Sequence, residues 1–167
     1  MKAAVLTVSD GVSAGVREDT SGDVLEELLR DEGYSVARTV VPDDADVIAA
    51  AIGSFGDAGV ALVLTTGGTG FAPRDVTPEA VKPLCTREMD GFAVLFHQAS
   101  HGTVGLSTLQ SRAFAGQIGD TFIFCLPGST GACRDGWDLV LRDELDSRYR
   151  PCSLAGLVPR LGELVPS

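Results

Sequence analysis

Short apolar runs alternate with amphipathic segments along this chain. Four runs rich in Val, Ile, Leu and Phe have the length of strands, and consecutive apolar positions are typical of strands buried on both faces of a sheet. They cover residues 2–8, 35–41, 60–64 and 122–126. The intervening segments repeat apolar residues with the period of a helix. They predict helices over residues 20–32, 43–55, 77–85, 90–101 and 132–141.

The apolar stripes of these helices predict which side chains face the sheet. The first helix is capped at Thr20 or Ser21 and ends at Gly33, a residue that favours the conformation just past a helix end. The side chains expected to pack inward are Val24, Leu25, Leu28, Leu29, Val47, Ile48, Ala51, Ile52, Phe55, Phe92, Leu95 and Phe96. The loop over residues 9–19 carries no regular pattern.

Strands that alternate with helices predict an α/β fold, a three-layer αβα sandwich with a largely parallel sheet. With 167 residues and no repeat or linker, the chain is expected to form a single domain over residues 1–167. Ligands of such sheets bind at the carboxyl ends of the strands. The sequence places four segments there: Ser9 with Asp10, Asp43, a glycine-rich loop, and residues 127–131.

The glycine-rich loop, Thr65-Thr66-Gly67-Gly68-Thr69-Gly70, directly follows the run at residues 60–64. Because glycines leave backbone N–H groups uncovered, such a loop can form a nest for an anion, most simply a phosphate. A helix is expected to follow, with Thr77 as its N-cap, Pro78 at its first position and Glu79 in its first turn.

An arginine and an aspartate, Arg74 and Asp75, separate this loop from the helix. The arginine suits a phosphate, whereas the carboxylate would repel it unless a divalent cation lay between them. Mg²⁺ bound by phosphate oxygens and one or two carboxylates is the usual arrangement. The stretch therefore predicts a phosphate site with a metal, and an ordinary strand-to-helix connection is the alternative.

Charge and hydropathy restrict the possible partners. The formal net charge is −10 and the isoelectric point is near 4.5, which argues against nucleic acid as a partner. No apolar run approaches the roughly 18 residues of a membrane span. The first ten residues have too short an apolar core for a signal peptide. We therefore expect a cytoplasmic protein with no membrane partner.

The cysteines and histidines carry weaker signals. The cysteines have neither a C-x-x-C pairing nor a metal-binding spacing, so they are expected to be reduced structural thiols. They are Cys85, Cys125, Cys133 and Cys152. His97 and His101 share a helical face at a spacing that can hold zinc, but the catalytic Glu of H-E-x-x-H is missing. Two histidines on a helix surface are the preferred interpretation.

Taken together, these motifs resemble the MogA/MoaB family of molybdenum cofactor biosynthesis proteins over about residues 4–161. The glycine loop joined to Arg74-Asp75-Val76-Thr77-Pro78-Glu79-Ala80 is the most specific match. Weaker matches are Thr7-Val8-Ser9-Asp10, Pro42-Asp43, Gln110-Ser111-Arg112 and Leu126-Pro127-Gly128-Ser129. Met89-Asp90-Gly91-Phe92, residues 107–112 and residues 145–152 resemble the MoaB branch more closely.

The resemblance implies a domain that binds molybdopterin and adenylylates it with Mg-ATP, releasing pyrophosphate, before metal insertion. It implies that Asp43 and Asp75 are the essential carboxylates, with Asp75 assigned to Mg²⁺ and Asp43 assigned either to Mg²⁺ or to orienting the substrate. The residues expected to bind the substrates molybdopterin and ATP are Ser9, Asp10, Thr66, Gly67, Gly68, Thr69, Gly70, Arg74, Ser111, Arg112, Pro127, Gly128 and Ser129.

The resemblance also implies a homotrimer or homohexamer, with other molybdenum cofactor biosynthesis proteins as further partners. The chain departs from the family at Asp90, Cys125 and the pair Thr130-Gly131, but it keeps both carboxylates. The main alternative is a MoaB-type protein that binds molybdopterin as a carrier or regulator without transferring AMP. A tubulin-like GTPase is a second alternative, but the further nucleotide motifs of that class are not found.

Overall fold

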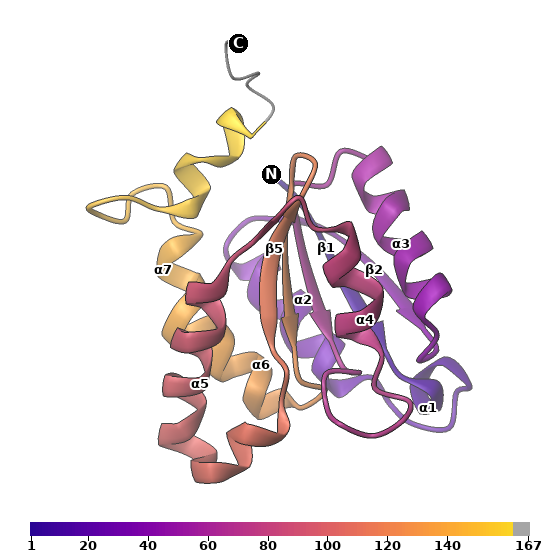
Figure 1. Ribbon diagram of the computed structural model, residues 1–167. Helices are drawn as coiled ribbons and strands as arrows, with labels where there is room; N and C mark the ends of the chain where they lie inside the picture. The colour runs from indigo at the N-terminus through magenta and orange to yellow at the C-terminus, as the bar shows by residue number, and fades with distance from the viewer. Residues whose placement is uncertain (162–167) are drawn as a thin grey trace.

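A mixed sheet lies between two layers of helices in the computed structural model, which describes residues 1–161 (Figure 1). Within that range the sheet has six strands in the order β2-β1-β3-β6-β5-β4. The four parallel strands are β2 (Ser35–Val41), β1 (Lys2–Val8), β3 (Leu62–Thr66) and β6 (Thr121–Leu126). The antiparallel strands are β5 (Phe114–Ile118) and β4 (Arg87–Glu88). The predicted three-layer fold with a largely parallel sheet is confirmed.

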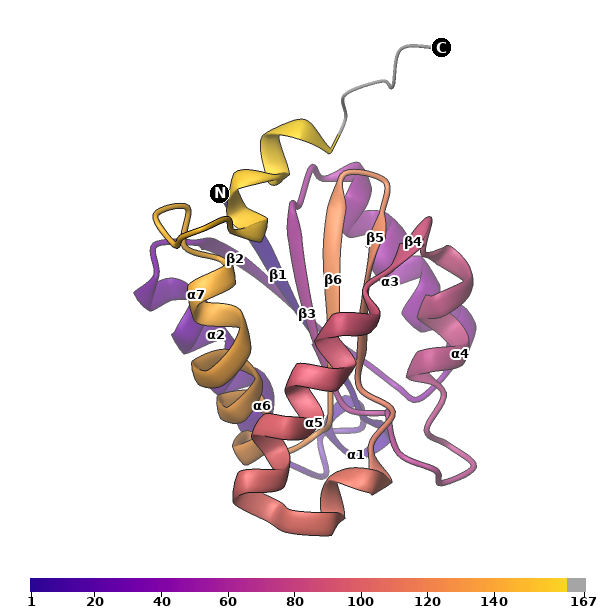
Figure 2. The same cartoon turned by 60° about the vertical axis from the view of Figure 1, so that its left-hand side comes forward.

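The helices divide between the two faces of the sheet (Figures 1 and 2). One face is covered by α2 (Thr20–Asp31), α5 (Asp90–Val104), α6 (Thr130–Gly136) and α7 (Arg142–Glu144). The other is covered by α3 (Ala45–Asp57) and α4 (Thr77–Val81). A π-helical stretch, Trp137–Leu141, joins α6 to α7. Short 3-10 segments occupy Lys82–Leu84, Gly105–Gln110, Leu154–Gly156 and Val158–Arg160.

Each face of the sheet has its own hydrophobic core, because successive strand residues point to opposite sides. Val5 of β1 packs with Leu25 of α2 and Phe96 of α5 on one face. Leu6 packs with Ile48 and other residues of α3 on the opposite face. Fully burying a Leu, Ile or Phe side chain contributes about 1.5–3 kcal/mol each, so the two cores together fix the helices on the sheet.

Two predicted core positions are wrong. Val47 of α3 is 40% exposed, and Leu95 of α5 is 52% exposed. In α5 the sheet is met by Phe92 and Phe96, one turn apart, and Leu95 lies beyond the edge of that stripe. The other predicted side chains of these helices are buried or half-buried.

Three strands and one short helix also differ from the predicted elements. The central strand β3 lies two residues later than predicted, because Thr65 and Thr66 belong to the sheet and not to the loop. The antiparallel strands β4 and β5 were not predicted. The loop after β1, which has no sequence pattern, contains the one-turn helix α1 (Asp10–Ser13), capped by Ser9.

The topology positions a crevice between β1 and β3. After β1 the chain leads to α2 on one face, and after β3 it leads to α4 on the other, so the loops at the carboxyl ends of these neighbouring strands diverge (Figure 2). Ligands of open α/β sheets bind at such a point.

Within residues 1–161, no helix has the length and apolar character needed to cross a membrane. All four cysteines are free thiols, as predicted.

Candidate functional site

A crevice of about 440 Å³ opens at the carboxyl ends of β1, β3 and β6. It brings together most of the predicted site residues, although they come from five separate segments of the chain. The residues that line it are Thr7, Val8, Ser9, Val12, Arg17, Glu18, Asp19, Thr20, Ser21, Asp43, Thr66, Gly67, Gly68, Thr69, Gly70, Asp75, Gln110, Ser111, Pro127, Gly128 and Ser129.

The floor of the crevice is the glycine loop that follows β3. Gly67 has φ +101°, and a Cβ at this position would lie 2.1 Å from the carbonyl oxygen of Val8, so only glycine fits. Its N–H donates to the carbonyl of Leu126 at 3.0 Å. By contrast, the N–H groups of Gly68, Thr69 and Gly70 have no partner within residues 1–161. These three donors are available for the predicted anion nest, whereas the N–H of Gly67 is already used.

Thr77 ties this loop to α4, which corrects its predicted role as N-cap. The helix begins at Thr77 itself, Val76 is the capping position, and no side chain caps the helix. The Thr77 hydroxyl donates instead to the carbonyl of Gly67 at 2.9 Å, and the Thr77 N–H donates to that of Gly68 at 2.9 Å. Because Thr77 is fully buried, these bonds fix the loop from below.

Two carboxylates, Asp43 and Asp75, stand beside the glycine loop. One oxygen of Asp43 accepts from the Asp10 N–H at 2.8 Å, and one oxygen of Asp75 accepts from the Ala72 N–H at 2.8 Å. The second oxygen of each carboxylate has no partner among the described residues. A Cβ on Gly68 would come within 3.2 Å of the free Asp43 oxygen. The backbone therefore orients both carboxylates and leaves one oxygen of each unpaired.

The two carboxylates lie close enough to influence each other. Burial raises the pKa of Asp43 above its usual range, and the negative charges of Asp10 and Asp75 act in the same direction. The hydrogen bond from the Asp10 N–H and the charge of Arg74 oppose this shift without cancelling it. A cation beside Asp43 would offset the repulsion from the neighbouring carboxylates and favour its ionised form, so the site is suited to bind one.

Arg74 lies outside the crevice lining and is paired. Its guanidinium donates two hydrogen bonds to the Asp10 carboxylate, at 2.8 and 2.9 Å. The Arg74 hydrogen bonds hold the pKa of Asp10 below its usual range. Asp10 in turn accepts from the Asp43 N–H at 3.0 Å. Arg74 and Asp10, which were both predicted to bind substrate, therefore hold the segment that carries Asp75 against the segment that carries Asp43.

Arg112 holds the glycine loop through its backbone. Its guanidinium donates to the carbonyls of Gly70 and Asp75, both at 2.8 Å, and forms an ion pair with Glu79. Its own N–H donates to the carbonyl of Thr69 at 2.8 Å. Like Arg74, this arginine is not among the residues that line the crevice. In this structure it positions the glycine loop, and its role beside phosphate stays a prediction.

Three serines present hydroxyl groups to the crevice. Ser9, Ser111 and Ser129 each accept a hydrogen bond from a backbone N–H two or three residues ahead, at 3.1–3.3 Å. Each hydroxyl keeps its proton to donate to a ligand. Thr66 differs, because its fully buried hydroxyl donates to the carbonyl of Pro127 at 3.1 Å and joins β3 to the last loop of the site.

The crevice also contains residues that the sequence analysis missed. Residues 17–21, at the start of α2 and just before it, line the crevice, and so does Gln110. Asp19 caps α2 by accepting from the Gly22 N–H, and it also accepts from the Thr7 hydroxyl at 2.6 Å and from Arg38 at 2.8 Å. Gln110 belongs to one of the weaker sequence matches, but nothing in the local sequence marks residues 17–19 as part of a site, since they reach the crevice only through the fold.

A protein-only metal site is not found within residues 1–161, where no three His, Cys, Asp or Glu side chains gather. The predicted histidines take no such part: His97 shares a hydrogen bond with the Thr108 hydroxyl at 2.8 Å, and His101 is exposed. A pair of carboxylates that each offer one oxygen nevertheless suits Mg²⁺, which keeps waters and takes its remaining ligands from substrate phosphates.

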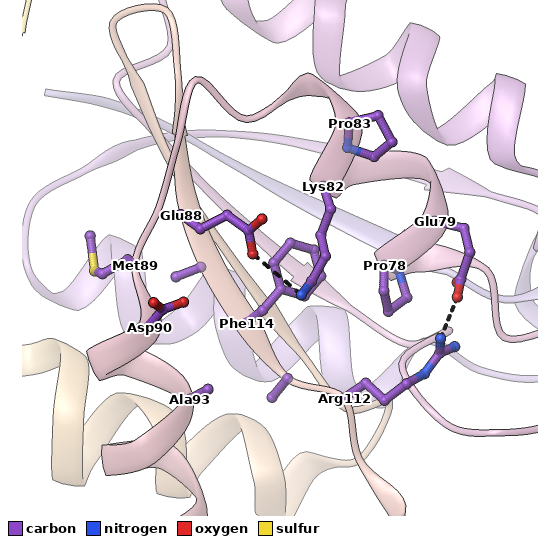
Figure 3. Close-up of a pocket in the computed structure, with 12 residues that line it drawn as sticks. Pro78, Glu79, Lys82, Pro83, Glu88, Met89, Asp90, Ala93, Arg112 and Phe114 are labelled. Atoms are coloured by element: carbon purple, nitrogen blue, oxygen red, sulfur yellow. Dashed lines mark hydrogen bonds and ion pairs between the residues drawn. The ribbon is translucent and has the colours of Figure 1, made fainter.

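A second cavity, of about 650 Å³, is lined by Arg112 together with residues of α4, β5 and the start of α5 (Figure 3). Its wall carries two ion pairs, Lys82 with Glu88 at 3.3 Å and Arg112 with Glu79. Four of the charged groups of this cavity are therefore already paired with each other, and Asp90 is the further carboxylate in its lining.

Residues 4–147 match a family model described as a probable molybdopterin binding domain. The molybdenum cofactor biosynthesis protein B of Escherichia coli K12 is 41% identical over 152 residues, which are 90% of this chain and 88% of that protein. The crystal structure of the tungsten cofactor synthesizing protein MoaB from Pyrococcus furiosus has a TM-score of 0.84 and 34% identity, with 97% of each chain covered. The Mog protein structure from Mycobacterium ulcerans has a TM-score of 0.83 and 30% identity, covering 96% of this chain and 98% of that one.

Proposed function

This chain belongs to the molybdenum cofactor biosynthesis family that includes MoaB and MogA, and from that premise we propose that it binds molybdopterin and adenylylates it with Mg-ATP. The higher identity to protein B places it nearer the MoaB branch, as the sequence motifs predict. We propose a cytoplasmic location for this step.

One observation carries the proposal: two carboxylates and three free N–H donors meet in one crevice. Asp43 and Asp75 each offer one unpaired oxygen beside the N–H groups of Gly68, Thr69 and Gly70. Backbone donors favour phosphate, whereas bare carboxylates repel it. Phosphate can bind beside the carboxylates when a divalent cation lies between the carboxylate oxygens and the phosphate oxygens. Asp43 and Asp75 would hold Mg²⁺, which would neutralise charge on the phosphates.

The proposed reaction fits residues that position substrates and do not abstract protons. A terminal phosphate oxygen of molybdopterin attacks the α-phosphorus of ATP, a new P–O bond forms, and the bond to the β-phosphate breaks with release of pyrophosphate. Because the attacking phosphate is ionised at neutral pH, no strong general base is required. The loop N–H groups and the hydroxyls of Ser9, Ser111 and Ser129 would bind phosphate oxygens and align the two anions.

A non-catalytic carrier or regulator is the second candidate function. The same crevice could hold molybdopterin without transferring AMP, because binding needs the N–H nest and the serines but not the pair of carboxylates. The two functions differ in what they require of Asp75. Adenylyl transfer needs its free oxygen, while binding alone should tolerate an amide at that position.

The deciding experiment measures pyrophosphate release from Mg-ATP with and without molybdopterin. The proteins compared are the wild type, Asp75→Asn, and the control Asp57→Asn, which changes an exposed carboxylate at the end of α3. Adenylyl transfer predicts release that requires molybdopterin, persists in Asp57→Asn, and falls by 100-fold or more in Asp75→Asn, the scale for losing one group that neutralises transition-state charge. Tight molybdopterin binding by all three proteins without any release would instead establish the carrier.

We also propose that the protein is a homotrimer or homohexamer. In support, α5 and the 3-10 segment after it expose a group of large apolar side chains, each more than half exposed. They are Val94, Leu95, Val104, Leu106 and Leu109. Exposed apolar groups of this kind are typical of surfaces that bind another protein chain. Light scattering after size exclusion would measure the mass, and a monomer at micromolar concentration would contradict this assignment.

A further inference from the structure

Arg17 is the single cationic side chain among the residues that line the crevice. Its guanidinium makes no hydrogen bond or ion pair with any residue in the range 1–161, and the residue is exposed. Around it the crevice is acidic, because Glu18, Asp43 and Asp75 also line it. An arginine in this position, left without a carboxylate partner, is free to receive an anion.

The other arginines near the site are already engaged. Arg74 is bound to Asp10, and Arg112 is bound to loop carbonyls and Glu79. Arg38 carries three carboxylates, with contacts of 2.5–3.0 Å to Asp19, Asp23 and Glu26. Moving any of these guanidinium groups to a ligand would break bonds that hold the fold, whereas using Arg17 breaks none.

The local backbone holds Arg17 in place before any ligand arrives. The N–H groups of Val16 and Arg17 both donate to the carbonyl of Gly11, at 2.9 and 3.0 Å. The aliphatic part of the Arg17 side chain lies against Gly11, where a Cβ would come within 2.9 Å of the Arg17 Cδ. Two residues later, Asp19 is tied to β1 through Thr7. The guanidinium therefore extends from an anchored segment.

We infer that Arg17 binds a phosphate group of the ligand at the side of the crevice next to α2. A planar guanidinium pairs with two phosphate oxygens at once, which a lysine or a single N–H cannot do. The site then has two anion-binding points, the glycine-loop nest and Arg17. It selects ligands with phosphate groups that can reach both. The choice of candidate ligands, ATP with its triphosphate and molybdopterin with its phosphate, rests on the proposed function. The rest of the inference does not.

The test compares dissociation constants for Mg-ATP and, separately, for molybdopterin. The variants are Arg17→Gln, Arg17→Lys, and the control Arg30→Gln, which removes an equal charge at the far end of α2, where Arg30 pairs with Glu26. Arg17→Gln should bind one ligand about 10- to 100-fold more weakly, the range for losing a charge-assisted hydrogen bond. Arg17→Lys should recover part of the loss, and Arg30→Gln should match the wild type.

The ligand that is weakened identifies the phosphate that Arg17 receives. A loss confined to Mg-ATP assigns Arg17 to the triphosphate, and a loss confined to molybdopterin assigns it to the phosphate of the pterin. Equal affinities of Arg17→Gln and Arg30→Gln for both ligands would overturn the inference, as would a wild type that binds neither. Arg17-dependent binding without pyrophosphate release would refute adenylyl transfer and leave Arg17 in its role.

Discussion

Replacing Gly67 with alanine tests whether the glycine loop is set by a close approach of two backbones. Gly67 has φ +101°, and an added Cβ would lie 2.1 Å from the carbonyl oxygen of Val8. Neither atom is the end of a flexible side chain, so β1 or the loop itself has to move. A backbone strain of this kind, added to the positive φ, should cost roughly 3 kcal/mol or more of unfolding free energy.

Gly15→Ala is the matched control for this change. Gly15 has φ +70°, but nothing lies within 4 Å of the position that its Cβ would take. It therefore incurs the conformational cost alone, about 1 kcal/mol. Both variants lose the same flexibility in the unfolded chain, so the difference between them isolates the contact with the Val8 carbonyl.

Thermal unfolding followed by circular dichroism measures the comparison. For a domain of this length, about 1 kcal/mol lowers Tm by roughly 2–4 °C, so Gly15→Ala should fall by that amount and Gly67→Ala by roughly 6–12 °C. Equal losses in the two variants would refute the close approach. Failure of Gly67→Ala to fold, with Gly15→Ala folded, would support it at a larger magnitude than estimated.

Two further predictions concern thiol reactivity and acid stability. Burial raises the pKa of Cys125 to about 12 and that of Cys133 to about 11. A thiol reagent at pH 8 should therefore label exposed Cys152 in the native protein and reach Cys125 and Cys133 only after unfolding. Rapid labelling of Cys125 or Cys133 in the native protein would contradict their burial. Although burial acts to raise it, hydrogen bonds from Thr7 and Arg38 hold the pKa of Asp19 below its usual range. Its stabilising effect is therefore present above about pH 4, the usual unfolded value, and lost as the pH falls through the folded pKa. Asp19→Asn, which can still cap α2, should cost about 1–2 kcal/mol at pH 7 and much less at pH 3, whereas a pH-independent loss would argue against the charge.

Sequence patterns predict the buried centre of this fold well, because there the local pattern and the tertiary environment agree. The runs that became β1, β3 and β6 are apolar at nearly every position, as strands covered on both faces must be. The edge of the sheet formed by β5 and β4 was missed for the opposite reason. β4 has only two residues, and β5 contains a glycine and a glutamine, so neither forms a run that stands out from a loop.

The candidate site shows the same division between local and long-range information. The glycine loop and Asp75 stand out in the sequence because their spacing is itself informative, whereas Asp43 was assigned as an essential carboxylate through the family resemblance. The roles of the arginines cannot be predicted in that way, since they depend on which partners the fold brings within reach. Arg74 pairs with Asp10 across 64 positions, Arg112 reaches back 42 positions to Gly70, and Arg17 is left unpaired.

The charge of the crevice makes a final prediction about divalent cations. Without a cation, a polyanionic ligand meets the free oxygens of Asp43 and Asp75, and the three N–H donors with Arg17 have to offset that repulsion. Affinity for ATP should therefore fall at least tenfold when EDTA replaces Mg²⁺. A double variant, Asp43→Asn with Asp75→Asn, removes both the metal ligands and the repulsion, so its affinity should be nearly the same in EDTA and in Mg²⁺. Asp57→Asn should keep the wild-type dependence, because it lies outside the crevice. If the double variant kept that dependence as well, the cation would act on the nucleotide alone, and the two carboxylates would not be its binding site.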